Sequence, residues 1–181
     1  MKNRKIIIAF ITSIMILTLS FIFDQQIFSL IQNLRTPTLD IFFSWILFIE
    51  KGIIYYPLTA ISAFGIIFWK KRKDLMPFTG TFSISLLLIL CLKIIVVRTR
   101  PLIPETDESF PAGHPLIFSP LPFLDYRKNK YLKIIWLIIS CLIVFTRIWF
   151  GLHYLSDIIA SIIIIYGTAH IIKTNWKKLK T

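Results

Sequence analysis

The sequence predicts an all-α membrane protein with a single domain over residues 1–181 that crosses the bilayer six times. Hydrophobic residues make up 56% of the chain, and 16 of its residues are phenylalanine, so its apolar share exceeds that of ordinary soluble domains. Several apolar runs are long enough for a spanning helix, which needs about 20 residues. Basic residues lie mostly between these runs, so the net charge of +12 does not indicate a nucleic-acid partner.

The apolar runs give the approximate bounds of the spans. We expect the first at about 5–23 as a retained signal anchor, because this run is long and no small-residue cleavage site follows it. Residues 24–40, with apolar residues at helical spacing, and a short helix at about 41–50 are expected at the membrane interface. The other spans are expected at about 53–69, 75–97, 114–126, 131–147 and 154–172. The fourth of the six contains prolines and is expected to be short and bent.

Lysine and arginine predict the orientation of these spans. They cluster at 2–5, 70–73, 127–130 and 173–180. Six spans place all four clusters on one face, and basic loops are retained in the cytoplasm. Both termini are therefore expected in the cytoplasm, and the membrane is expected to be a bacterial inner (cytoplasmic) membrane. The outer face then carries residues 24–40, 98–113 and 148–153.

Ionisable residues on the outer face are not explained by topology. They are Lys93, Arg98, Arg100, His114, Arg147, His153 and Asp157. Taken singly, each also fits an ordinary helix end, loop or structural position, and Lys93 can extend to the interface. Ionisable groups at membrane depth are nevertheless expensive, and they usually pair with one another or mark a functional cavity.

The spacing of these residues favours one shared anion site. His153 and Asp157 are four residues apart at the start of a helical segment, so both can lie on one face. The carboxylate can then accept the proton of one imidazole nitrogen and leave the other nitrogen free to attack. Lys93 and Arg100 are seven apart, and Arg147 precedes His153 by six. Cations that converge beside imidazoles suit a phosphate group.

Three short motifs resemble those of the type 2 phosphatidic acid phosphatase superfamily, which includes lipid phosphatases. The family patterns are Lys-x6-Arg-Pro, Pro-Ser-Gly-His and Ser-Arg-x5-His-x3-Asp. This sequence reads KIIVVRTRP from Lys93 to Pro101, PAGH from Pro111 to His114, and TRIWFGLHYLSD from Thr146 to Asp157. Each motif is weak alone, but together they keep the family's order on one predicted face. Ala112 stands where the family has serine, whereas Thr146 keeps the hydroxyl group of the serine it replaces.

The resemblance implies a six-span helical bundle that acts on a phosphate of a membrane lipid. It implies that His153 is the nucleophile and forms a phosphohistidine, that Asp157 orients it, and that His114 is the general acid. The phosphate oxygens would bind the side chains of Lys93, Arg100 and Arg147 and the amide of Gly113. No metal or other cofactor is implied, because the cations take that role. One donor fewer at Ala112 would slow the reaction by roughly tenfold to a thousandfold without changing its type.

The motifs leave several functions open. The lipid substrates that the family suggests are undecaprenyl diphosphate, phosphatidylglycerophosphate, phosphatidic acid and lipid A phosphates. A phosphotransferase, which passes the phosphoryl group to a lipid hydroxyl instead of water, would carry the same motifs. A non-catalytic lipid-binding or transport protein is a third alternative, and its support is Ala112. The motifs predict no oligomeric state.

Overall fold

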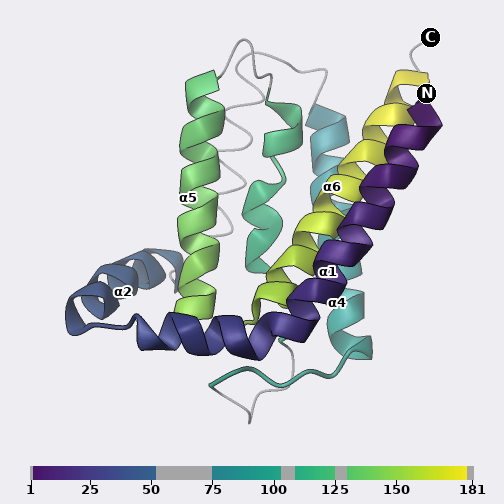
Figure 1. Ribbon diagram of the computed structural model, residues 1–181. Helices are drawn as coiled ribbons and strands as arrows, with labels where there is room; N and C mark the ends of the chain where they lie inside the picture. The colour runs from purple at the N-terminus through teal and green to yellow at the C-terminus, as the bar shows by residue number, and fades with distance from the viewer. Residues whose placement is uncertain (1, 52–74, 103–108, 125–129, 179–181) are drawn as a thin grey trace.

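The computed structural model describes residues 2–51, 75–102, 109–124 and 130–178 (Figure 1). Its long helices are α1 (Lys2–Asn33), α4 (Leu75–Ile95), α5 (Lys130–Trp149) and α6 (Leu155–Lys178). The shorter helix α2 (Pro37–Lys51) follows α1, and two 3-10 helices, η2 (His114–Phe118) and η3 (Leu121–Phe123), precede α5. The prediction of an all-α protein is confirmed over the described residues.

Four helices in the described part of the chain are long and apolar enough to cross a membrane. They are Ile7–Asn33, Leu75–Ile95, Lys130–Trp149 and Leu155–Trp176. They correspond to the first, third, fifth and sixth spans expected from the sequence, and α2 covers the short helix expected at about 41–50. The span expected at 53–69 lies outside the described residues, so the count of six stays a prediction.

Helix α1 is longer than the span of about 5–23 that the sequence predicts, because it continues without a break to Asn33. Figure 1 shows it changing course, from an upright direction to one that crosses the base of the bundle. Ser20, Asp24 and Phe28 are buried and lie at successive intervals of four residues. This spacing places them on one face of the helix. α1 therefore presents a buried carboxylate on the stripe through which it packs into the bundle, where it contacts α5 and α6.

The proline-rich segment after His114 forms η2 and η3 rather than the bent span that the sequence predicts. Proline lacks the N–H group that each turn of a longer α-helix requires. The segment packs against α5 and α6 (Figure 1). Trp136 donates its indole N–H to the carbonyl oxygen of Ile117 over 2.7 Å, and the ammonium group of Lys173 donates to that of Pro122 over 2.6 Å. These side chains satisfy carbonyl groups that irregular backbone would otherwise leave unpaired inside the bundle.

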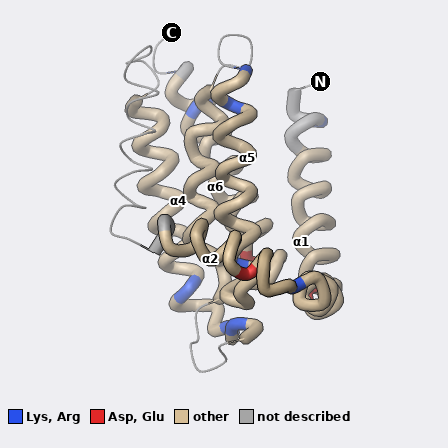
Figure 2. The backbone as a smooth tube through the Cα atoms, turned by 90° about the vertical axis from the view of Figure 1, so that its left-hand side faces the viewer, with Lys and Arg blue, Asp and Glu red and all other residues tan. Residues whose placement is uncertain are grey.

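The two ends of the bundle differ in what they carry. The first residues of α1 and the last residues of α6 lie at one end, and the turn between α5 and α6 lies at the other (Figure 1). Figure 2 shows lysine and arginine toward the ends of α4, α5 and α6 rather than along their middle. This distribution is typical of a protein that spans a membrane.

Gly151 makes the tight turn between α5 and α6 possible. Its φ angle is +61°, in the left-handed region that residues with a side chain rarely adopt. A Cβ atom at this position would lie 2.4 Å from Cγ of Leu102, whose backbone N–H donates to the Gly151 carbonyl oxygen over 3.1 Å. The glycine therefore allows the loop after α4 to pack directly on this turn.

Replacing Gly151 by alanine is expected to lower the free energy of unfolding by roughly 1–3 kcal/mol, because the substitution combines backbone strain with a clash. The matched control is Gly167→Ala in α6, where no atom lies within 4 Å of the added Cβ. The control should be neutral or stabilise the helix by up to about 1 kcal/mol. Thermal unfolding of both purified variants in detergent measures the difference, and equal unfolding midpoints would contradict the assigned role of Gly151.

Candidate active site

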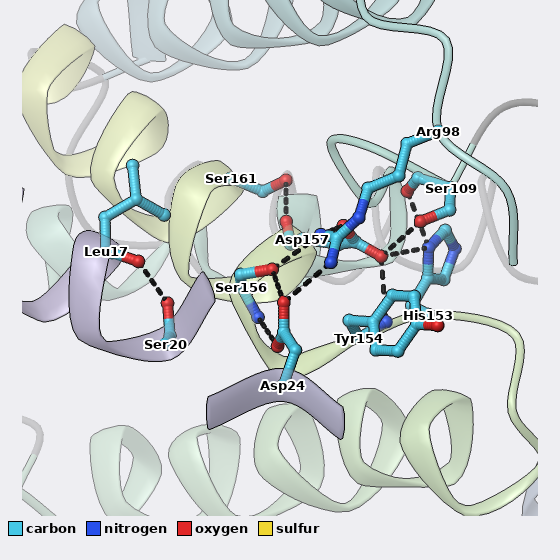
Figure 3. A network of polar contacts seen from close by, with 10 residues as sticks. All are labelled: Leu17, Ser20, Asp24, Arg98, Ser109, His153, Tyr154, Ser156, Asp157 and Ser161. Atoms are coloured by element: carbon cyan, nitrogen blue, oxygen red, sulfur yellow. Dashed lines mark hydrogen bonds and ion pairs between the residues drawn. The ribbon is translucent and has the colours of Figure 1, made fainter. Parts of the chain in front are cut away.

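His153 lies in the turn between α5 and α6, and its side chain is buried. Its Nδ1 atom lies 2.8 Å from the carbonyl oxygen of Ser109 and 3.6 Å from Oδ2 of Asp157 (Figure 3). Both neighbouring atoms are hydrogen-bond acceptors, so they favour the tautomer that carries its proton on Nδ1. The lone pair of Nε2 is then the nucleophilic position of the ring.

Burial has the largest effect on the protonation of His153 and lowers its pKa. The negative charge of Asp157 opposes this effect, whereas the positive charges of Lys93 and Arg100 add to it. The net result is a pKa below the ordinary value of 6.5. The imidazole is therefore neutral at neutral pH, which is the state that a nucleophile requires.

Asp157 lies in the first turn of α6 and is fully buried. Its Oδ1 accepts a hydrogen bond of 2.6 Å from Arg98, and its Oδ2 accepts bonds of 2.5 Å from the Ser109 hydroxyl and 2.8 Å from the backbone N–H of Tyr154. A carboxylate in this position also stabilises the start of the helix by capping its free N–H groups. The sequence predicts that Asp157 accepts the imidazole proton of His153, but the carbonyl oxygen of Ser109 lies closer to Nδ1 than either carboxylate oxygen does.

Ser109 belongs to this site although none of the three motifs contains it. The residue is fully buried, its N–H donates to the carbonyl oxygen of Arg98 over 2.9 Å, and its hydroxyl donates to Asp157. Its own carbonyl oxygen faces His153. A backbone carbonyl leaves no side-chain pattern in a sequence. The available signal was position alone, because Ser109 lies just before the motif that begins at Pro111.

The cations predicted to bind an anion lie around the two imidazoles. Lys93 is in the last turn of α4, Arg147 is in the last turn of α5, and Arg100 lies in the loop after α4. The charges of all three act on His114, and those of Lys93 and Arg100 also act on His153. The Nε atom of Arg100 is buried and has no hydrogen-bond partner among the described residues. A buried donor of this kind is suited to bind an anion.

His114 and Gly113 lie at the start of η2, beside the turn that carries His153. The centroids of the His114 and His153 rings are 6.2 Å apart. Gly113 caps the N-terminal end of η2, and its carbonyl oxygen accepts a hydrogen bond of 3.1 Å from the N–H of Leu116. The fold therefore brings together two imidazoles that are far apart in the sequence.

Ala112 ties the PAGH turn to α6 through its backbone. Its N–H donates to the carbonyl oxygen of Asp157 over 3.1 Å, and its carbonyl oxygen accepts a 2.5 Å bond from the hydroxyl of Ser161. Its side chain is fully buried in a hydrophobic cluster with Ile117 and Leu121. The acidic, cysteine and histidine side chains of the described segments form no group of three or more that would hold a metal ion.

Comparison with known proteins identifies relatives with related activities, although no protein-family model matches the chain. Phosphatidylglycerophosphatase B of Bacillus subtilis strain 168 is 28% identical over 152 residues, which cover 75% of this chain and 74% of the relative. Undecaprenyl-diphosphatase of Sulfolobus acidocaldarius is 28% identical over 149 residues, which cover 76% of this chain and 71% of the relative. Both alignments span most of each protein.

Two crystal structures share the fold. LpxE of Aquifex aeolicus superposes with a TM-score of 0.66 at 24% identity, over 83% of this chain and 94% of that one. The first transmembrane PAP2 type phosphatidylglycerolphosphate phosphatase from Bacillus subtilis superposes with a TM-score of 0.65 at 22% identity, over 93% and 96%. These relatives and the common fold confirm the resemblance to the type 2 phosphatidic acid phosphatase superfamily that the three motifs predict.

Proposed function

We propose that this protein is an integral membrane phosphatase that hydrolyses a phosphate monoester or diphosphate of a membrane lipid without a metal ion. One observation carries the proposal: the buried His153 has its Nδ1 atom 2.8 Å from the Ser109 carbonyl oxygen, and its ring lies beside that of His114, where the charges of Lys93 and Arg100 act on it. The named activities of the relatives, a phosphatidylglycerophosphatase and an undecaprenyl-diphosphatase, support the same class of substrate.

The reaction takes place in two steps at His153. In the first step Nε2 forms a bond to the phosphorus atom while the bond from phosphorus to the lipid oxygen breaks, and protonated His114 gives its proton to that oxygen. In the second step a water molecule attacks the phosphohistidine. His114 takes a proton from the water, the P–N bond breaks, and inorganic phosphate leaves.

Lys93, Arg100 and Arg147 stabilise the charge that builds on the phosphoryl oxygens during both steps. They come from α4, the following loop and α5. In this proposal they are in place before the substrate binds. Fixed charges of this kind need no reorganisation during the reaction and act strongly where water is excluded. The amide of Gly113 supplies a further donor in this proposal. Burial and the charges of the neighbouring cations lower the pKa of His114 to about 2. The first step requires its protonated form, so in this proposal the negative charge of the bound phosphate raises that pKa.

The substrate is a lipid whose phosphate reaches the end of the bundle opposite the termini. Undecaprenyl diphosphate, phosphatidylglycerophosphate, phosphatidic acid and lipid A phosphates all have this chemistry. The basic termini favour an orientation in which this end faces the periplasm or the cell exterior and the protein lies in the bacterial inner membrane.

The proposal predicts that His153→Ala abolishes phosphate release from every lipid phosphate that the unmodified protein hydrolyses. The expected loss is at least about a thousandfold, because the nucleophile itself is removed. The assay measures inorganic phosphate released in detergent micelles that contain EDTA, over a panel of the four candidate lipids. The matched control is His170→Ala, which changes an exposed histidine near the other end of α6 and should keep full activity.

The same assay separates the alternative functions. Appearance of the phosphoryl group on an added lipid alcohol, without free phosphate, would establish a phosphotransferase. If the unmodified protein neither releases nor transfers phosphate, the remaining alternative is a lipid-binding or transport function. Activity that disappears in EDTA and returns with a divalent cation would contradict the proposed independence from metal.

A second prediction concerns the proton that His114 gives to the leaving group. His114→Gln should slow hydrolysis of a lipid phosphate by roughly 10²- to 10⁴-fold, because an alkoxide leaves poorly without a proton. The same variant should hydrolyse p-nitrophenyl phosphate at a rate much closer to that of the unmodified protein, since this leaving group needs no proton. Parallel kcat measurements on both substrates provide the test. An equal loss on both would show that His114 does not act as the acid.

A third prediction concerns pH. Only neutral His153 attacks, and its pKa is lowered by burial, so kcat/KM for p-nitrophenyl phosphate should remain high as the pH falls to 6.5 and decline only below it. Asp157→Asn removes a charge that raises this pKa, so the decline should move to still lower pH while the rate falls. The profiles are corrected for the substrate's own ionisation. A decline centred above pH 6.5 in the unmodified protein would contradict the environment assigned to His153.

A further inference from the structure

Arg98 differs from the other cations at this end of the bundle because two carboxylates bind it. Its Nη1 atom donates to Oδ1 of Asp157 over 2.6 Å, and its Nη2 atom donates to Oδ2 of Asp24 over 2.7 Å. Nη1 also donates to the hydroxyl of Ser156 over 2.6 Å. Figure 3 shows the guanidinium group lying between the two aspartates. Because these two carboxylates neutralise its positive charge, Arg98 is not a phosphate ligand.

Aromatic side chains hold the same guanidinium group in place. Its central carbon lies 4.8 Å from the ring centroid of Phe21 and 4.4 Å from that of Tyr154. Cation–π contacts at these distances stabilise an arginine that is partly removed from water. Together with the ion pairs, they leave Arg98 one defined position.

Asp24 connects this arginine to α1. The carboxylate is buried, its Oδ1 accepts a hydrogen bond of 3.0 Å from the N–H of Ser156, and its Oδ2 accepts one from the Ser156 hydroxyl. The N–H groups in the first turn of a helix have no partner inside the helix. Asp24 of α1 therefore binds the N-terminal end of α6, and Asp157 caps the same helix end from its own first turn.

A continuous chain of hydrogen bonds runs from Arg98 to His153. Arg98 binds one oxygen of Asp157, the other oxygen of Asp157 accepts the hydroxyl proton of Ser109, and the Ser109 carbonyl oxygen accepts the Nδ1 proton of His153. The backbone closes the loop, because the N–H of Ser109 donates to the carbonyl oxygen of Arg98. Figure 3 labels these four residues and also Asp24, which binds Arg98 at the end of the chain away from His153.

We propose that Asp24 and Arg98 are positioning residues for His153: they fix the carboxylate of Asp157 and, through Ser109, the tautomer and direction of the imidazole. The consequence for catalysis rests on the proposed function, whereas the consequence for the tautomer does not. Without Arg98, the buried carboxylates of Asp24 and Asp157 would lose the cation that both of them bind, so one of them is expected to move or to take up a proton. Either response releases Ser109 from its place beside His153.

The tautomer of His153 is measured by ¹⁵N NMR of histidine-labelled protein in detergent. The chain has three histidines, so His114→Gln and His170→Gln variants assign the signals. The unmodified protein should show His153 protonated on Nδ1. Arg98→Gln should give a mixture of tautomers or a shifted signal, and Asp24→Asn a smaller change in the same signal. Arg98→Lys keeps the charge without the two-pronged geometry and should fall between the unmodified protein and Arg98→Gln.

The matched control is Arg35→Gln. Arg35 also forms an ion pair at this end of the bundle, at 3.0 Å from Asp40, and its side chain contacts Gln32 and the ring of Phe150 rather than the residues that bind Asp157. The control should leave the His153 signal unchanged. In the phosphate-release assay, Arg98→Gln and Asp24→Asn should lower kcat by roughly 10- to 100-fold with KM within about threefold, because the affected group is the nucleophile and not the phosphate ligands. The inhibition constant of inorganic phosphate should likewise stay within about threefold.

The two readouts distinguish failure of this inference from failure of the proposed function. An unmodified protein without phosphatase activity would overturn the proposed function, while the NMR comparison would still decide the positioning role. An unchanged His153 signal in Arg98→Gln would overturn the inference whatever the activity. A rise in KM and in the phosphate inhibition constant, with kcat retained, would also overturn it by making Arg98 a phosphate ligand. If Arg98→Gln does not fold, Asp24→Asn and Arg98→Lys decide the question by the same criteria.

Discussion

The carboxylate of Asp157 is the point on which this end of the bundle depends. It is fully buried, and its two oxygens accept hydrogen bonds from the loop after α4, from Ser109 and from the N-terminal end of its own helix. A buried charge is tolerated only when it is paired and hydrogen-bonded. The segments that supply these partners are therefore held at fixed positions relative to one another, and His153 lies among them.

Two arginines at this end differ in their partners. Arg98 points into the protein and neutralises aspartates, whereas Arg100, two residues later, has a buried donor that no described residue satisfies. Both arginines occur in the same short motif, and spacing alone does not separate them. The difference between the two arginines comes from Asp24, which binds Arg98 and lies 74 residues from it in the sequence. Tertiary packing of α1 therefore supplies the second carboxylate that binds Arg98.

Much of the fold follows from hydrophobic runs, but the irregular parts do not. The positions of α4, α5 and α6 agree with the spans predicted from length and hydropathy, because each helix must satisfy its own backbone within the membrane. Helix α1 extends past the predicted end because Asp24 and Phe28 are buried against the bundle. Hydropathy does not predict this tertiary packing. The segment after His114 depends on Trp136 and Lys173 from other helices to satisfy its carbonyl groups.

Two opposing influences act on the protonation of the His153 imidazole. Burial and neighbouring cations lower its pKa and keep the ring neutral, but the same influences alone would also make it a weaker base. The hydrogen bond to the Ser109 carbonyl and the charge of Asp157 act in the opposite direction and return electron density to the ring. Of these two contributions, the sequence motifs contain only the charge of Asp157. The other comes from the backbone carbonyl of Ser109, a residue outside the motif that contains His153.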